Sequence, residues 1–385
     1  MESKNGRSNG GPYAPFSSDF STDPSGSKDS KLVSVVIPAY RCSQYIAQAV
    51  QSVLAQTFPA HELIVVNDGS PDTPLLEAAL APYKDSIRYI KQPTRGPSGA
   101  RNTGIVQARG NYIAFLDGDD YWCSDHLAKQ IEILRQDPRL DLVYCDSILM
   151  KDERPFARAF DIEPQCAKVT FESLLVEDSA ISTSSTVVSR NAIMAAGMFD
   201  ETFMRCEDFD TWLRMSFAGA CMAFHTEARV YHRISDIGLS ADRWSMKKDR
   251  IRVYQKVDAT LRISEQQRRI VHEMVAKTQA QCDIERMKHA LEAGDYNEAV
   301  EAADHASALK KSWKVHVSLF CLRTAPRLFR RLHLARIFLL GRHKNSKRPA
   351  AYLSYVQDHP SASGDENTRV EAAAASAEVV PRGRN

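Results

Sequence analysis

Strand and helix signals alternate along the first third of this 385-residue chain, and this alternation restricts the fold more than any other feature. Leu32–Ile37 is an apolar, β-branched run, Tyr45–Gln56 has apolar residues at helical spacing, and Glu62–Val66 is a second buried-strand run. A strand, a helix and a strand in this order predict a parallel crossover. Further elements are expected at 74–83 (helix), 87–90 (strand), 99–108 (helix) and 112–116 (strand). We therefore expect an α/β sandwich that binds a nucleotide at the carboxyl ends of its strands.

The pattern changes from Leu261 onward, where strand-like runs disappear and long charged stretches with helical spacing follow. We expect helices over 265–293 and 296–309. The segment 291–306 resembles half of a tetratricopeptide unit, but no second copy occurs at a period near thirty-four residues. The sequence therefore predicts a helical hairpin rather than a repeat array.

Both ends of the chain have a composition that cannot bury enough apolar surface to offset chain entropy. Ser, Gly and Pro make up half of residues 1–30, and the stretch from about Gln357 is polar or Ala-rich without an amphipathic stripe. We expect a disordered leader over 1–30, an α/β domain over 31–250, a helical region over 251–355 and a disordered tail over 356–385.

Charge and cysteine content narrow the class of protein. Lys and Arg number 50 against 48 Asp and Glu, and a net charge of +2 argues against nucleic-acid binding. The eight cysteines form no CxxC pair, which fits reduced thiols in a cytosolic protein. The N-terminus lacks an apolar signal core, and no apolar run approaches the roughly eighteen residues that span a bilayer. We expect a protein that is neither secreted by the usual signal nor integral to a membrane.

The most informative motif is a cluster of acids directly after the strand at 112–116. Asp117 and Asp119 are separated by Gly118, and two carboxylates at a strand end can hold a divalent metal that bridges a diphosphate. The alternative is an acidic turn in which Gly118 supplies the bend.

Two other strand ends favour a binding site over a set of turns. Asp68 follows the second strand, and Pro38, Ala39 and Tyr40 follow the first, so these polar ends converge on one edge of the sheet. The segment 96–102 opens a predicted helix with glycines and Arg101, which suits close approach to a phosphate or ribose but is a weak signal by itself.

Four of these motifs, in this order and spacing, resemble glycosyltransferase family 2. They are the segments 33–40, 66–70, 99–104 and 112–122, and the resemblance covers about 32–240. It implies a GT-A fold, a mostly parallel sheet flanked by helices, here followed by the all-helical region. It also implies an inverting transfer of a sugar from a nucleotide diphosphate donor, with Mg²⁺ or Mn²⁺ as cofactor.

The same resemblance assigns donor-side roles to individual residues. Pro38, Ala39 and Tyr40 would surround the nucleobase, with Asp68 as its hydrogen-bonding carboxylate and Arg101 near the ribose or diphosphate. Asp119 would ligate the metal directly, and Asp117 would lie nearer the ribose or a metal-bound water. Asp120 is expected to brace the loop. Thr94 stands where the family often has Asn.

The acceptor side is represented by the segment 206–214. An inverting displacement needs a carboxylate to accept the hydroxyl proton, and Asp208 matches the catalytic base of the family, with Glu207 on the acceptor side. The alternative is an acidic helix start near the positive end of a helix dipole. His232 and Arg233 resemble the closing donor-side segment, although the family often has Arg before His, with a residue between them.

A basic stretch at 322–348 holds nine Lys and Arg residues and no acid, interleaved with leucine, isoleucine and phenylalanine. Such a basic amphipathic helix favours binding to an anionic membrane surface. The alternative is a C-terminal helix that packs its apolar stripe on the catalytic domain.

Taken with these features, the resemblance implies a metal-dependent inverting glycosyltransferase that acts in cell-envelope polysaccharide or lipopolysaccharide biosynthesis. A UDP-sugar is the expected donor, the acceptor is a saccharide or a lipid-linked sugar, and no nucleic acid is involved. The expected location is the cytoplasm or the inner face of the membrane. The alternative is a catalytically silent nucleotide-binding scaffold whose helical region mediates protein interaction; it predicts broken acid motifs, whereas the acids at positions 68, 117, 119 and 208 are present.

Overall fold

The computed structural model describes residues 32–177, 180–235, 238, 242–309 and 313–343. Within these residues a nine-stranded mixed sheet has the order β3-β2-β1-β4-β8-β6-β9-β5, and β7 pairs with β6. The predicted leader at 1–30 and tail at 356–385 lie outside the described residues. The compact unit that contains the sheet extends to Phe338.

The first half of the sheet is parallel, as the alternation of strand and helix predicts. β1 (Val33–Ala39) lies between β2 (Glu62–Asp68) and β4 (Tyr112–Phe115), and β3 (Arg88–Gln92) extends the sheet beyond β2. Because the strands are parallel, the segments that follow β1, β2 and β4 meet at one edge. This edge carries the predicted donor-side residues.

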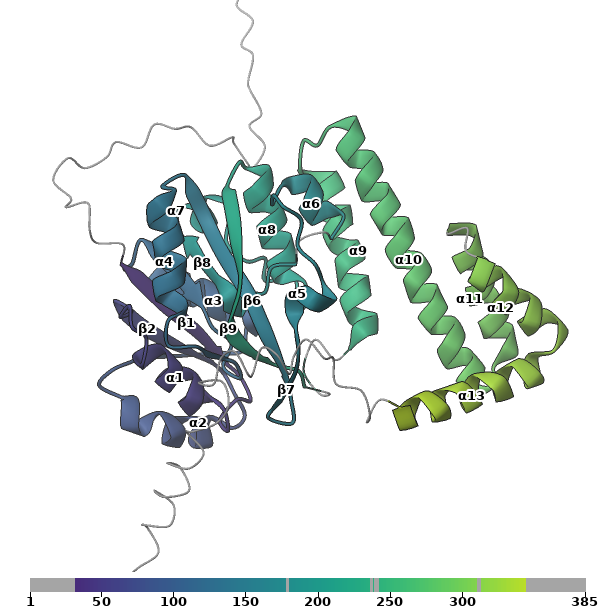
Figure 1. The fold of residues 1–385 in the computed structure, drawn as a ribbon, viewed down its shortest axis with the longest axis horizontal. Coiled ribbons are helices and arrows are strands. Elements are labelled where there is room, and N and C mark those ends of the chain that lie inside the picture. The colour runs from purple at the N-terminus through teal and green to yellow at the C-terminus, as the bar shows by residue number, and fades with distance from the viewer. Residues whose placement is uncertain (1–31, 178–179, 236–237, 239–241, 310–312, 344–385) are drawn as a thin grey trace, which may run out of the picture. The chain divides into compact units, whose positions relative to one another are not determined.

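Helices cover both faces of these strands, so the strands are apolar on both sides (Figure 1). Val36 of β1 packs in the same core cluster as Ile105 of α3 (Gly96–Gln107). Val35 and Ile37 face a second cluster with α1 (Ile46–Leu54). α2 (Thr73–Leu80) and α4 (His126–Gln136) also contribute apolar residues to this second cluster. α3 begins three residues before the predicted start at 99, because Pro97 is well suited to a first helical turn.

The second half of the sheet is mixed. β8 (Thr186–Ser189) runs antiparallel to β4 and to β6 (Leu140–Lys151), while β9 (Cys221–Arg233) runs parallel to β6. The short β5 (Tyr121–Trp122) pairs with the end of β9, so His232 and Arg233 reach the acid cluster after β4. The remaining elements are β7 (Arg154–Arg158), α5 (Ala159–Ile162), α6 (Phe171–Leu175), α7 (Arg190–Ala195) and α8 (Glu207–Phe217).

Five helices follow the sheet in the described part of the chain. They are α9 (Arg243–Thr260), α10 (Glu265–Ala293), α11 (Tyr296–Leu309), α12 (Trp313–Thr324) and α13 (Pro326–His343). The predicted bounds of the α10–α11 hairpin are confirmed. The Ser264 side chain caps α10 at its start, and Gly294, at a φ of 86°, ends it.

The helical part begins earlier than the change predicted at Leu261. α9 spans the predicted division at residue 250, and its Val253, Tyr254 and Val257 belong to the same apolar core as β4 and β6. The apolar pattern of α9 is hard to recognise in the sequence, because its buried face also carries Arg250, which pairs with Glu177 at 2.8 Å.

The stretch at 322–348 is not one helix, contrary to the prediction. α12 ends at Thr324, and α13 starts at Pro326, because proline lacks the N–H needed inside a helix but fits its first turn. Residues 344–348 lie outside the part of the chain that the structure describes. None of the described helices is long and apolar enough to cross a bilayer.

Candidate active site at the sheet edge

The loop after β1 presents an aromatic ring at the sheet edge. Pro38 and Ala39, predicted to follow the first strand, instead belong to the end of β1, where Ala39 is buried and Pro38 is half-buried, whereas Tyr40 follows the strand and is 47% exposed. The backbone N–H of Arg41, a residue with a φ of 53°, donates to Ser70 Oγ at 2.7 Å, which ties this loop to the one after β2. An exposed aromatic face at this edge can stack on a planar ligand such as a nucleobase.

Asp68 ends β2 and is 3% exposed. Its Oδ1 accepts from the N–H of Arg95 at 2.9 Å and from Gln92 Nε2 at 2.7 Å, and its Oδ2 accepts from the N–H of Gly96 at 2.8 Å. These contacts satisfy backbone donors at the start of α3. Asp68 therefore joins β2 to the first turn of α3. The contact of Asp68 with a nucleobase stays a prediction.

The acid cluster after β4 contains one carboxylate that is entirely enclosed. Asp120 is 0% exposed and accepts from Ser184 Oγ at 2.6 Å and from the N–H of Arg233 at 2.9 Å. His232 Nδ1 lies 2.9 Å from Asp120 Oδ2, and this carboxylate raises the pKa of His232 to about 9. Asp120 and a protonated His232 thus brace the loop that carries the other two acids.

Asp119 has an environment that favours a bound cation. Its burial, together with the nearby Asp120 and Asp117 carboxylates, raises the pKa of Asp119 to about 7. Crowded carboxylates of this kind are the hard oxygen donors that Mg²⁺ and Mn²⁺ prefer, usually with substrate phosphates as further ligands. Across the described ranges no three His, Cys, Asp or Glu side chains form a group that could hold a metal ion by themselves.

Arg101 connects the acid cluster to the predicted acceptor side. Its Nη2 donates to Asp117 Oδ1 at 2.7 Å and its Nη1 donates to Glu207 Oε1 at 2.6 Å, and its side chain is only 5% exposed. The ring of Phe199 lies 5.4 Å from the guanidinium carbon. The guanidinium is thus committed to two carboxylates from separate parts of the chain, and its predicted contact with the ribose or diphosphate stays a prediction.

The predicted acceptor-side acids occupy the first turn of α8. Cys206 precedes them in the left-handed region, at a φ of 59°, a conformation that is uncommon for a residue with a side chain and is often found at functional sites. Burial raises the pKa of Glu207 to about 7, and burial also raises the pKa of Asp208. A carboxylate with a raised pKa is a stronger base, which suits Asp208 to proton abstraction.

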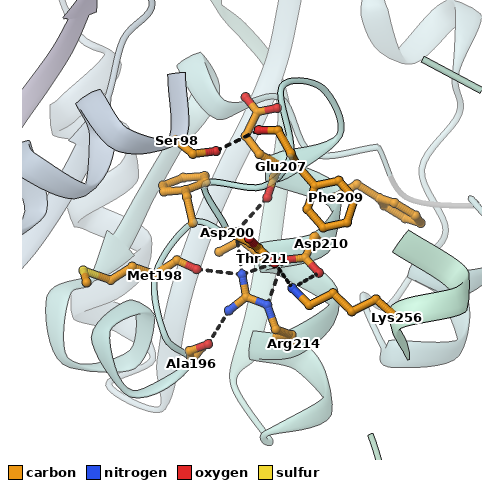
Figure 2. Close-up of polar contacts among 12 residues, drawn as sticks. Ser98, Ala196, Met198, Asp200, Glu207, Phe209, Asp210, Thr211, Arg214 and Lys256 are labelled. Atoms are coloured by element: carbon orange, nitrogen blue, oxygen red, sulfur yellow. Dashed lines mark hydrogen bonds and ion pairs between the residues drawn. The ribbon is translucent and has the colours of Figure 1, made fainter. Parts of the chain in front are cut away.

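Figure 2 shows a buried network that holds α8 in place and that the sequence analysis did not identify. Arg214 donates to the carbonyl oxygens of Ala196 and Met198 and to Asp210 Oδ2, the last at 2.8 Å. Lys256 of α9 lies 2.8 Å from Asp210 Oδ1. The i, i+4 spacing of Asp210 and Arg214 was the available sequence signal. The network fixes the helix whose first turn carries Asp208.

Arg233 lies beside the acid cluster and makes several contacts. Its Nη1 donates to the carbonyl oxygen of Asp119, and its Nε donates to Glu153 Oε1 at 2.7 Å. Its guanidinium carbon lies 4.5 Å from the centre of the Tyr45 ring and 5.0 Å from that of Tyr121. The structure therefore brings both His232 and Arg233 to the loop of Asp119, while most of the following segment, 236–241, lies outside the described residues.

Comparisons with known proteins find similarity to glycosyltransferases. Residues 34–178 match the model of Glycosyl transferase family 2. An uncharacterized glycosyltransferase of Rickettsia bellii is 32% identical over 189 residues, which are 48% of this chain and 27% of that relative. The chain thus matches only about a quarter of that relative's length.

A second relative matches over more of its length, and a solved structure shares the fold. The Escherichia coli UDP-Glc:alpha-D-GlcNAc-diphosphoundecaprenol beta-1,3-glucosyltransferase WfgD is 30% identical over 187 residues, 48% of this chain and 70% of WfgD. The mannosyltransferase PcManGT of Pyrobaculum calidifontis, solved with GDP-Man and Mn²⁺, has a TM-score of 0.52 and 18% identity, covering 85% of this chain and 88% of PcManGT. By its motifs, its GT-A fold and these similarities, the chain belongs to glycosyltransferase family 2.

Proposed function

We propose that this protein is an inverting glycosyltransferase that moves a sugar from a nucleoside diphosphate sugar to a hydroxyl group. The observation that carries this proposal is the pair of contacts made by Arg101, which joins Asp117 of the acid cluster to Glu207 of the turn that carries Asp208. A transfer reaction needs its donor and acceptor sites held in fixed relative positions, because both substrates react in line. A buried, doubly engaged guanidinium supports that requirement.

In the proposed reaction Asp208 accepts the proton of the acceptor hydroxyl. The acceptor oxygen forms a bond to the anomeric carbon from the face opposite the diphosphate, and the bond from that carbon to the diphosphate oxygen breaks, so the configuration is inverted. The raised pKa of Asp208 favours this role. No second carboxylate nucleophile is required, in contrast to a retaining glycosidase.

Asp119 and Asp117 would hold Mg²⁺ or Mn²⁺ together with the diphosphate. The cation would supply Lewis-acid stabilisation of the negative charge that develops on the leaving group. The raised pKa of Asp119 supports this assignment, because a nearby cation would relieve the carboxylate crowding. Tyr40 and Asp68 would contact the nucleobase, and Arg233 and His232 would shape the donor side of the loop.

A UDP-sugar is the proposed donor, and a saccharide or lipid-linked sugar is the proposed acceptor. The printed name of WfgD gives both a UDP-linked donor and a lipid-linked acceptor for that enzyme. The proposed setting is therefore cell-envelope polysaccharide or lipopolysaccharide synthesis, in the cytoplasm or at the inner face of the membrane.

The first experiment is a thermal-shift panel with UDP, GDP, dTDP and CMP, each with and without Mn²⁺. We expect UDP with Mn²⁺ to raise the melting temperature of the wild type and not that of Asp119→Asn. A ligand at a hundred times its Kd would add about 2.7 kcal/mol of stability. Asp85→Asn, a change at an exposed turn, serves as the matched control and should keep the shift. The absence of any nucleotide effect would contradict an intact donor site and would favour the helical region as the functional part of the chain.

A further inference from the structure

α12 has an apolar face that the fold covers and another that it leaves exposed. Val315, Leu319 and Leu322 are buried, and the last two join the core cluster of α10 and α11. Trp313, Val317 and Phe320 lie on the other side of the helix and are 73%, 50% and 67% exposed. Their spacing of i, i+4 and i+7 makes a continuous stripe.

The first turns of α13 add to this exposed surface. Leu328 and Leu332 are 59% and 62% exposed at a spacing of four residues, whereas Phe329 packs against the α10–α11 cluster. Six of the fourteen large apolar side chains that are exposed in the described residues lie between 313 and 334. Scattered exposed apolar residues are ordinary, but such a concentration marks an interaction surface.

The sequence segment that carries the stripe has charges of a single sign. Residues 310–357 contain twelve Lys and Arg and no Asp or Glu. Arg323 pairs with Asp304 of α11, and Arg330 donates to the carbonyl oxygen of Glu292. Lys314, Arg327 and Arg331 are exposed beside the apolar residues.

We propose that the α12–α13 surface, defined by Trp313, Val317, Phe320, Leu328 and Leu332 with their basic neighbours, docks on an anionic lipid bilayer. Tryptophan and phenylalanine favour the interface between headgroups and acyl chains, and basic residues favour an anionic leaflet. The stripe of α12 lies mainly before the basic stretch in which the sequence analysis placed the membrane contact. The proposal is independent of the donor chemistry proposed above.

A second copy of the chain fits this surface less well than a lipid headgroup does. A two-fold symmetric contact would bring the same patch of each copy together. Because the patch has basic neighbours and no acidic residue in its sequence segment, that contact would place positive charges opposite one another. An anionic leaflet supplies the complementary charge.

The test uses the full chain with vesicles of phosphatidylcholine alone or with one third phosphatidylglycerol. Trp313 is 73% exposed, whereas Trp122 and Trp212 are 3% and 2% exposed and Trp244 is half-buried, so the part of the emission change that Trp313→Phe removes reports on Trp313. We expect flotation with the anionic vesicles, together with a blue shift of tryptophan emission and protection from acrylamide. Trp313→Phe should keep binding and lose most of that spectral change.

Substitutions separate the apolar and the charged contributions. Phe320→Ala should lower the vesicle partition coefficient about tenfold, and Arg327→Gln and Arg331→Gln should each lower it about fivefold. Raising the salt from about 0.1 M to about 1 M should weaken binding, because the screening length falls from about 10 Å to about 3 Å. Leu75→Ala on α2, which is 66% exposed, and Arg139→Gln, with a side chain 84% exposed, are matched controls that should bind as the wild type does.

Three results would overturn the proposal. The first is equal binding of the wild type and Phe320→Ala, and the second is no preference for anionic over neutral vesicles. The third is a blue-shifted, acrylamide-protected Trp313 in the protein without vesicles. This result would show that the stripe is already covered, either by another segment of the same chain or by a second copy, and the mass from light scattering distinguishes a monomer from a dimer. The nucleotide-dependent rise in melting temperature is measured for each variant in parallel. A variant that loses vesicle binding but keeps this rise has an intact donor site.

Discussion

Arg101 Nη1 lies 2.6 Å from Glu207 Oε1, although the two residues are 106 positions apart in the chain. Both side chains are nearly enclosed, with exposures of 5% and 11%. The first turn of α8 is thereby fixed to α3, which packs on β1 and β2.

Replacing Arg101 by Met should destabilise the fold strongly. The change leaves the Glu207 and Asp117 carboxylates without their shared partner, and breaking a buried ion pair in this way costs about 3–5 kcal/mol. Urea unfolding above pH 7, where Glu207 is ionised, measures the loss. Arg139→Ala removes an exposed partner of Asp137 and should cost no more than about 1 kcal/mol. Similar costs for the two variants would contradict the enclosed geometry of Arg101.

The pH dependence of stability should carry a contribution from Glu207. Burial raises the pKa of Glu207 from 4.5 to about 7, so between these values the folded state retains a proton that the unfolded state has lost. The free energy of unfolding attributable to Glu207 should therefore be highest below about pH 4.5 and fall as the pH rises toward 7.

Denaturant titrations of the wild type and Glu207→Gln between about pH 4.5 and about pH 7 test this pH dependence. The stability of the wild type relative to the variant should decrease as the pH rises. Glu132→Gln, an exposed change on α4, should leave the slope unaltered. A relative stability that increases with pH would show that Arg101 keeps Glu207 ionised.

Asp208→Asn should abolish most of the transfer activity without weakening donor binding. A positioned general base contributes about 10²–10⁴-fold to the rate, and an amide cannot accept the hydroxyl proton. The measurement is kcat for release of the nucleoside diphosphate, with the donor Kd determined in parallel, and Glu132→Gln serves as the control. If kcat falls by less than tenfold, another group is the base.

Gly104→Ala should destabilise the contact between α3 and β1. A Cβ at this position would lie 2.8 Å from Val36 Cγ2 and closer still to Cγ1. Overpacking of this kind costs about 1–3 kcal/mol. The double variant with Val36→Ala should cost less than the two single changes together, because the smaller side chain makes room for the new methyl group. Additive costs would argue against a direct contact.

Local patterns in the sequence determined the order and type of most elements. The alternating apolar runs predicted β1–β4 and their helices, and the bounds of α10 and α11 followed from helical spacing alone. The Asp117–Asp120 motif and the residues at the strand ends also indicated the edge of the sheet that carries the predicted donor-side residues, because parallel strands place their carboxyl ends together. Each of these patterns involves residues that are close together in the sequence, so it can be recognised in a single sequence.

Only the tertiary structure decided which of these residues meet. The β5–β9 pairing brings His232 to Asp120, 112 positions away, and the packing of α8 on the sheet brings Glu207 to Arg101. The exposure of Trp313 and Phe320 likewise depends on which face of α12 packs on α10 and α11. Such contacts depend on strand pairing and helix docking over long chain separations, which a single sequence does not encode as a local pattern.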